Sequence, residues 1–138
     1  MTADAMQSEP SLSRNPLLDL DRHWAVRLTT FRRDGTPVST PVNVAAKGNR
    51  LFFRTYEQAG KFKRIRNNPR VLVAPSNPRG VATGEAVAAR AVLLSGADEE
   101  EAGRLIDAKH RIFQGFLVRT AHRVRGFTTR HFELLPAG

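Results

Sequence analysis

Two tight turns divide residues 24–55 into three short β-type runs, and the positions of these turns limit the folds that the sequence can adopt. Asp34-Gly35 is a dipeptide typical of hairpin turns, and Lys47-Gly48-Asn49 is a second turn signal. Polar and apolar residues alternate in the runs between these turns, as they do in strands with one buried face. We therefore expect an antiparallel meander with strands at residues 24–33, 37–46 and 51–55.

The rest of the chain adds β-type runs and helical segments. Asn15-Pro16 is a helix start signal, since Asn caps a helix and Pro suits its first turn. A short basic helix follows residue 55, and apolar residues recur at helical spacing over residues 98–125, with Gly115 as an expected interruption. Further strands are expected at residues 70–76, 84–95 and 127–135. Six strands, with one helix after the third and one before the last, predict an antiparallel barrel or strongly curved sheet.

The length and the N-terminal sequence predict one domain behind a flexible tail. A chain of 138 residues suits a single domain, which we place at residues 15–138, after a polar tail at residues 1–14. The tail lacks the basic and apolar regions of a secretory signal, and no window is apolar for long enough to cross a membrane. Together with the absence of cysteine, this predicts a cytoplasmic protein without membrane contact.

Several common catalytic motifs are missing from the sequence. The four histidines show no HxH or HExxH spacing that would place two of them at one metal ion. The chain also has no GxSxG, GxGxxG or P-loop motif. The acidic residues 98–101 lie at an expected helix start, where they favour the helix dipole. We therefore expect no catalytic side chain and no metal site, and any bound nucleotide must use another kind of site.

The basic segment that follows the third expected strand is the strongest functional signal. Arg54 and Thr55 end this strand, and the next helix carries Lys61, Lys63 and Arg64. Backbone N–H groups without intrahelical partners converge at a helix start, so an anion is favoured there. An Arg, a Thr hydroxyl and a Lys at one corner would form a phosphate cradle. The alternative interpretation is a solvated basic helix face without a ligand.

The net charge of +9 also raises the possibility of a nucleic-acid partner. Against this, the arginines are spread along the chain, and few aromatic residues outside the expected core are free to stack on bases. A basic nucleic-acid-binding module is kept as a less favoured alternative. Short polar residues on the second expected strand, Ser39, Thr40 and Asn43, instead suit the wall of a ligand site.

The order of elements and two sequence stretches resemble a known family. TTFRRDGTPVSTPVNV, followed by LFFRT and GKFKRIRNNPRVLVAP, is similar to the split β-barrel flavin and deazaflavin oxidoreductases, the pyridoxamine 5′-phosphate oxidase-like proteins. The resemblance implies a six-stranded antiparallel split β-barrel and a homodimer with two cofactor sites at the subunit interface. Members that use flavin mononucleotide (FMN) carry Arg-x-x-x-x-Lys on the second strand, where this chain has Ser39 and Val44. The chain therefore looks most like the branch that binds the deazaflavin coenzyme F420.

This resemblance implies a reductase that passes a hydride from reduced F420 to an unsaturated small molecule. It assigns the cofactor phosphate to Arg54, Thr55 and Lys61, and the acidic cofactor tail to Lys63 and Arg64. It places the residues that line the deazaflavin ring on the second strand: Ser39, Thr40, Pro41 and Asn43. It implies that Ser76 and Asn77 reach the cofactor of the partner subunit. An FMN- or haem-binding member of the same fold is the alternative.

Overall fold

The computed structural model describes residues 15–23, 25–114 and 128–137. Their secondary structure runs as the 3-10 helix η1 (Pro16–Arg22), β1 (Ala25–Phe31), β2 (Pro37–Lys47), β3 (Arg50–Tyr56), α2 (Gly60–Asn67), β4 (Arg70–Pro75), β5 (Val87–Leu93), α3 (Gly96–Gln114) and β6 (Thr129–Pro136). Within the described residues no helix is long and apolar enough to cross a membrane. The expected helical residues 115–125, together with Trp24 and Phe127 of the expected strands, lie outside the description.

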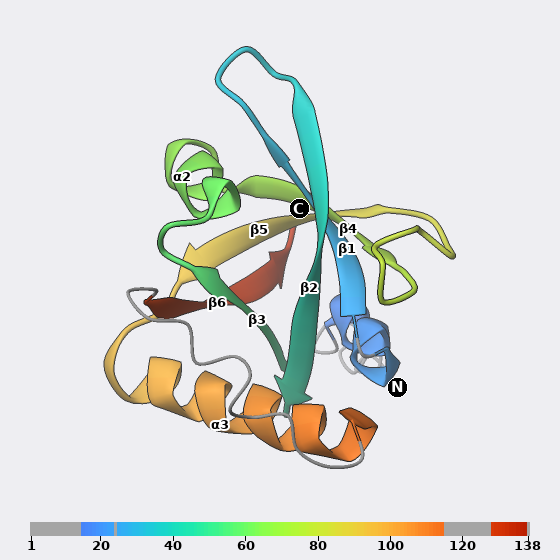
Figure 1. Cartoon of the computed structure of the whole chain (residues 1–138), viewed down its shortest axis with the longest axis vertical. Coiled ribbons are helices and arrows are strands. Elements are labelled where there is room, and N and C mark those ends of the chain that lie inside the picture. The colour runs from blue at the N-terminus through green and yellow to red at the C-terminus, as the bar shows by residue number, and fades with distance from the viewer. Residues whose placement is uncertain (1–14, 24, 115–127, 138) are drawn as a thin grey trace, which may run out of the picture.

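The strands form a closed antiparallel barrel in the order β1-β2-β3-β6-β5-β4 (Figure 1). β1 closes the barrel by pairing with β4, and the register places Leu28 opposite Val73. β6 lies between β3 and β5, so the last strand completes the wall between segments that are distant in sequence. The predicted six-stranded antiparallel barrel is confirmed, and the alternative of an open, strongly curved sheet is not observed.

Local sequence signals explain most of the element boundaries. Asn15 caps η1, because its side chain accepts a hydrogen bond from Leu17 N at 2.9 Å. The β1–β2 turn relies on Asp34, whose carboxylate accepts from Thr36 N at 3.0 Å, and on Gly35, whose φ of 91° suits glycine. Two expected strands were too long: β1 ends at Phe31 rather than at residue 33, and β5 runs from Val87 to Leu93 rather than over residues 84–95.

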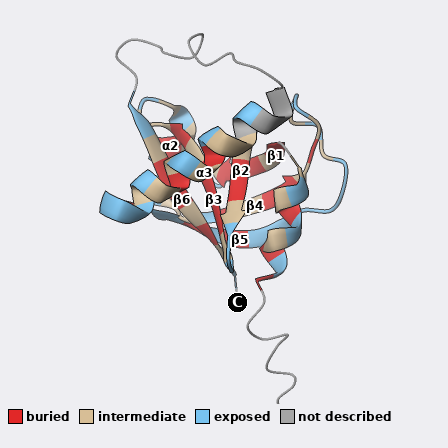
Figure 2. Cartoon of the chain, turned by 90° about the horizontal axis from the view of Figure 1, so that it is seen from below, coloured by how far each residue is buried: buried red, intermediate tan, exposed pale blue. Residues whose placement is uncertain are grey.

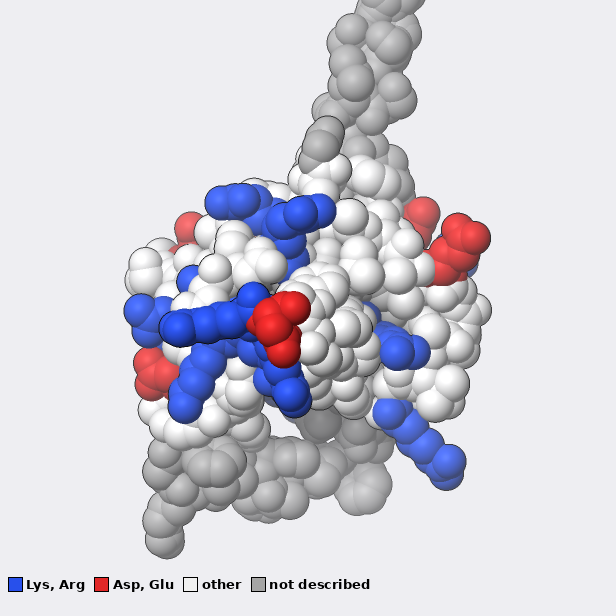
Figure 3. Space-filling model, turned by 90° about the horizontal axis from the view of Figure 1, so that it is seen from above, with Lys and Arg blue, Asp and Glu red and all other residues white. Residues whose placement is uncertain are grey.

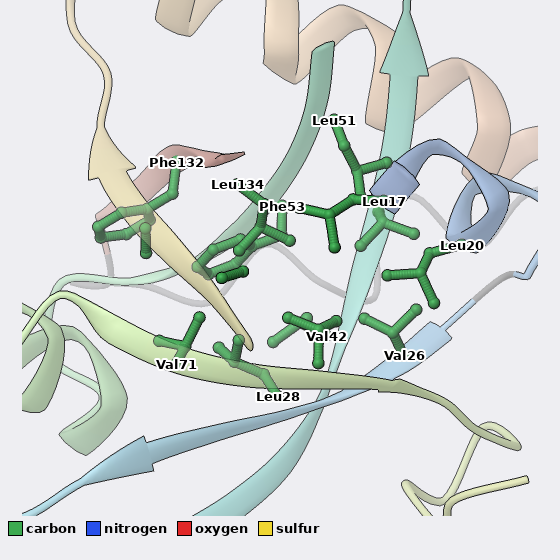
Figure 4. Packing of buried hydrophobic residues seen from close by; sticks show 14 of the residues in the cluster. Leu17, Leu20, Val26, Leu28, Val42, Leu51, Phe53, Val71, Phe132 and Leu134 are labelled. Atoms are coloured by element: carbon green, nitrogen blue, oxygen red, sulfur yellow. The ribbon is translucent and has the colours of Figure 1, made fainter. Parts of the chain in front are cut away.

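The barrel interior is filled by the inward-facing residues of all six strands (Figure 4). Phe53 of β3 stacks on Phe132 of β6 with their ring centroids 5.0 Å apart. α2 adds Phe62 and Ile65 to the same core, and the Phe62 ring meets Phe132 edge-on at 5.9 Å. The hydrophobic face of α2 is thereby fixed against the barrel, which determines where its basic residues lie.

α3 lies across the outside of the barrel, against β2, β3 and β6 (Figure 2). It buries Ala102 and Ile106 against Phe52 and Ala45 in a second, smaller cluster. Ion pairs surround this contact: Lys47 with Glu101, Arg54 with Asp107, and Arg50 with Asp98. The side chains of β2 and β3 named here therefore contact α3.

Candidate functional site

The side chains of Arg54 and Thr55 lie on opposite faces of β3. Thr55 is buried on the inner face, which it shares with Phe53, because successive side chains of a strand alternate. Arg54 points to the outer face, where its Nη1 atom donates to the Asp107 carboxylate of α3 at 2.6 Å. The expectation that the two residues form one corner of a phosphate cradle is therefore wrong. Arg54 serves the attachment of α3 to the barrel.

Lys61 lies at the start of α2 without a carboxylate partner in the described part of the chain. Its side chain is half-buried, and burial lowers the pKa of its amine, with a further lowering from the Arg64 guanidinium. Ala59, the N-cap residue, provides no side-chain hydrogen bond to the helix start. A desolvated ammonium beside uncapped backbone N–H groups favours an anionic ligand.

Arg64 is held one helical turn further along α2. Its Nε atom donates to Thr30 Oγ1 of β1 at 2.6 Å, and Thr30 is fully buried. Burial lowers the pKa of the Arg64 guanidinium, and Arg32 of the β1–β2 turn lowers it further. Residues three apart on a helix are neighbours, so Lys61 and Arg64 form a pair of cations that the structure brings together.

The expected ring-lining residues of β2 are divided between its two faces. Thr40 shares the inner face with the core residue Val42, and its Oγ1 atom is buried without a hydrogen-bond partner among the described residues. Ser39, Pro41 and Asn43 alternate with these positions and lie on the outer face. The four residues therefore do not line one surface, as the sequence had predicted. Only the outer three share a face.

Outer-face contacts of β2 support this division. Ser39 Oγ lies 2.7 Å from Thr29 Oγ1 of β1, directly across the strand pair. A Cβ atom at Gly80 would lie 3.0 Å from Cδ of Pro41, so the loop after β4 lies against this face. Asn43 is partly exposed beside them. This face thus combines hydroxyl, amide and apolar groups.

Ser76 and Asn77 support the loop that follows β4. The Ser76 hydroxyl donates to the Asn77 carbonyl oxygen at 2.9 Å. The Asn77 side-chain oxygen accepts from Arg79 N at 2.9 Å and from Val81 N at 3.0 Å. These hydrogen bonds give both residues a structural role within their own chain. Contact with a partner's cofactor stays a prediction.

Arg130 is a residue of this region that the sequence interpretation missed. It is paired with Thr55 in the β3–β6 register and lies 5.8 Å from the ring centroid of Phe62. Its guanidinium also donates to Glu57 at 3.1 Å and to Glu99 at 3.3 Å. Arg130 thereby links the loop before α2 to the start of α3. No motif marks it, because its partners are distant in sequence.

The basic side chains on two parts of the surface differ in whether they are paired with carboxylates. The Lys and Arg residues next to α3 are paired with carboxylates, as described above. Around α2 and the β1–β2 turn, several basic side chains lie close together, with an acidic group among them (Figure 3). Lys63 and Arg66 are exposed there, and no ion pair of either is found within residues 25–114 and 128–137. The excess positive charge is therefore concentrated where the candidate site lies.

Two other features of the described residues are separate from this site. An apolar cavity of about 350 Å³ lies beside η1 and is lined by Leu17, Leu20, His23, Pro75 and Val87, among others. It shares no lining residue with the Lys61–Arg64 pair. In the same described ranges, no group of three histidine or carboxylate side chains could hold a metal ion.

Comparison with known proteins identifies the family. A model of the pyridoxamine 5′-phosphate oxidase family matches residues 19–131, which is most of the chain. The protein therefore belongs to the pyridoxamine 5′-phosphate oxidase family, as the sequence resemblance indicated. A search of curated proteins found no matching sequence.

Solved structures with the same fold differ in what they bind. A putative pyridoxamine 5′-phosphate oxidase from Listeria innocua is 15% identical, with a TM-score of 0.54 and coverage of 96% of this chain and 94% of that chain. The haem storage protein HutZ from Vibrio cholerae is 17% identical, with a TM-score of 0.60 and coverage of 94% and 90%. An F420 reductase is 20% identical, with a TM-score of 0.56 and coverage of 86% and 90%. These similarities establish the fold alone.

Proposed function

We propose that the protein binds the phosphate of coenzyme F420 at the start of α2 and acts as an F420-dependent reductase. The observation that carries this proposal is the Lys61–Arg64 pair, two half-buried cations with no carboxylate partner among the described residues. A phosphate would supply the negative charge that this pair lacks. The resemblance of the chain to F420-binding proteins supports F420 as the cofactor.

The residues of the described structure divide into three proposed roles. Lys61, Arg64 and Thr55 are proposed to hold the phosphate, and the guanidinium of Arg64 can offer two parallel donors. Lys63 is exposed and meets the acidic tail of the cofactor. Ser39, Pro41 and Asn43 share the outer face of β2 and line the ring. Arg54 and Thr40 have no part in this revised proposal.

The protein needs no nucleophile or metal ion for this activity. When bound, reduced F420 supplies the hydride that adds to an unsaturated small organic substrate. The contribution of the protein is to bind the phosphate, orient the ring and place the substrate against it. The fixed pair of cations provides the first of these functions, because both side chains are anchored by a helix whose apolar face is buried.

FMN is the alternative cofactor, and it would use the same phosphate site. The exposed basic side chains favour F420, because its acidic tail extends beyond the phosphate and FMN has no such tail. The same surface also supports the less favoured alternative of a nucleic-acid partner. Haem is a further alternative within this fold. His131, one of its possible ligands, is 8% exposed and lies beneath α3, against Gly103.

A homodimer is also part of the proposal. Val92 and Leu93 of β5 are 37% and 40% exposed, and Val87 is 44% exposed. Of these, only Val92 lies on the outer face, because Val87 and Leu93 share the side of the core residues Ala89 and Ala91. An exposed apolar group on the outside of a barrel favours contact with a second copy of the chain. A second copy would also bring another β4–β5 loop, with its Ser76 and Asn77, toward the site. Location in the cytoplasm stays a prediction.

The visible spectrum of the purified protein, followed by cofactor titration, tests the proposal. F420, FMN and haem absorb differently, so a co-purified cofactor identifies its class. A colourless preparation would be titrated with F420, FMN and haem, and with a short single-stranded DNA. Tight binding of F420 supports the proposal. Preferential binding of FMN, haem or DNA would replace it with the corresponding alternative.

A further inference from the structure

Gly60, the first residue of α2, lies directly beneath the guanidinium of Arg64. A Cβ atom built on Gly60 would come within 2.7 Å of Arg64 Nη1, 3.6 Å of Cζ and 3.8 Å of Nη2. The backbone of Gly60 does not require glycine, because its φ is outside the left-handed range found at Gly35, Gly48, Gly80 and Gly96. The absence of a side chain at Gly60 therefore provides space for the Arg64 guanidinium.

The opposite side of the guanidinium is fixed by β1. Arg64 Nε donates to Thr30 Oγ1 at 2.6 Å, and Thr30 cannot shift easily because it is completely buried in a strand. The Arg64 side chain is thus held between a strand residue and the bare backbone of its own helix. This arrangement keeps it next to Lys61, despite the repulsion between the two cations.

We propose that Gly60 is a positioning residue that keeps the Arg64 guanidinium beside Lys61, where both contact the cofactor phosphate. The proposal rests on the proposed function, because it assumes that the Lys61–Arg64 pair binds a phosphate. Gly60 acts through Arg64 and contributes no atom of its own to the ligand. Any side chain at this position would force the guanidinium away from its place between Thr30 and α2.

The substitution Gly60→Ala should weaken binding with little change in stability. The nearest obstacle to the new methyl group is the end of a flexible side chain, so the fold can accommodate it. Alanine suits a helix better than glycine, but the displaced guanidinium leaves the buried Thr30 hydroxyl without its donor, so we expect the melting temperature to change by no more than about 2 °C. F420 should bind about five- to thirtyfold more weakly, because one charge-assisted contact is displaced. A purely structural role for Gly60 would lower both quantities together.

NMR of the arginine Nε–H groups tests the positioning step without any cofactor. In the wild-type protein, the Arg64 Nε–H signal should be shifted and protected from exchange by its bond to Thr30. Both Gly60→Ala and Thr30→Val should remove this protection, and Arg64→Lys identifies the signal by its loss. Titration with F420 then measures the consequence for binding. The control is the double variant Gly60→Ala with Arg64→Ala, which should bind F420 no more weakly than Arg64→Ala alone.

The two readouts separate the inference from the proposed function. If Gly60→Ala leaves the Arg64 signal protected, the positioning role is wrong, whatever the protein binds. If the signal changes while F420 affinity is unaltered in Gly60→Ala and in Arg64→Ala, the assignment of the phosphate to Arg64 is wrong. Loss of protection together with weaker binding, and no further loss in the double variant, supports both.

Discussion

The imidazole of His131 lies against the backbone of Gly103, in the middle of α3. A Cβ atom at Gly103 would be 3.2 Å from His131 Nε2, and that nitrogen is buried with no hydrogen-bond partner among the described residues. The other ring nitrogen, Nδ1, lies 3.3 Å from the Glu99 carboxylate. The charged ring would carry a proton on both nitrogens, and the proton on Nε2 would be buried without an acceptor among the described residues.

This contact predicts a pH-dependent stability. Burial lowers the pKa of His131 below 6.5, although the hydrogen bond to Glu99 partly opposes this. Well above pH 6.5 the ring is neutral in both the folded and the unfolded chain, so stability does not depend on pH through this group. As the pH falls below this value, the unfolded state binds the proton first, and the free energy of unfolding decreases.

The variant His131→Gln isolates this effect, because it removes the titration and keeps a polar side chain of similar length. Urea denaturation at several pH values between 8 and 5 should show a larger loss of stability for the wild-type protein than for the variant. The remaining histidines are common to both proteins and cancel in the difference. Parallel pH profiles would show that His131 does not titrate abnormally.

The Lys61→Ala substitution should weaken F420 binding by about ten- to a hundredfold, through the loss of one charge-assisted phosphate contact. The stability of the free protein should stay equal or rise slightly, because burial disfavours the charged amine in the folded state. Lys47→Ala is the matched control: it removes the same charge from an ion pair with Glu101, at the α3 side of the barrel. Equal affinities for the two variants would argue against a phosphate at Lys61.

F420 should bind at least tenfold more tightly than FMN, and its affinity should fall more steeply with salt. The acidic tail of F420 can interact with the exposed Lys63 and Arg66, and interactions between exposed charges are screened as ionic strength rises. Fluorescence titration of both cofactors at low and high salt measures the two slopes. If FMN binds more tightly, or if the slopes are equal, the FMN alternative is favoured.

The protein should behave as a dimer in light scattering at micromolar concentration. Val92→Asp places a charge on the outer face of β5 and should shift the mass to that of a monomer, because a charge without a partner is costly to bury in an interface. Arg104→Ala, on the exposed part of α3, is the control and should remain dimeric. A wild-type monomer would contradict the prediction outright. An unaffected dimer in the Val92 variant would place the interface elsewhere.

The sequence was most informative where local signals decide the structure. Alternation and turn residues such as Gly35 predicted the strands, and the short basic helix expected after residue 55 is α2. The site was predicted less well, because side-chain direction on a strand depends on register and on what covers each face. Arg54 and Thr55 are adjacent in sequence, yet they lie on opposite faces of β3.

Contacts between distant segments could not be inferred from spacing at all. Arg130 lies beside Phe62 and Glu57 only because β6 is inserted between β3 and β5. No sequence signal near residue 130 predicts this position of β6. The space that Gly60 leaves for the Arg64 guanidinium could not be predicted from the sequence either. Gly60 is an ordinary helix-start glycine by its sequence, and its significance depends on the guanidinium that lies over it.

The pairing of β1 with β4 has a further consequence for how copies of this chain can associate. Although the barrel is closed, residues 37–43 of β2 pair with β1 alone, so this part of β2 presents a row of backbone donors and acceptors on its other side. A neighbouring molecule could extend the sheet there by adding a strand, which is a common route to association. Where the described strands are paired on both sides, two copies of the chain can associate only through side chains that fit face to face.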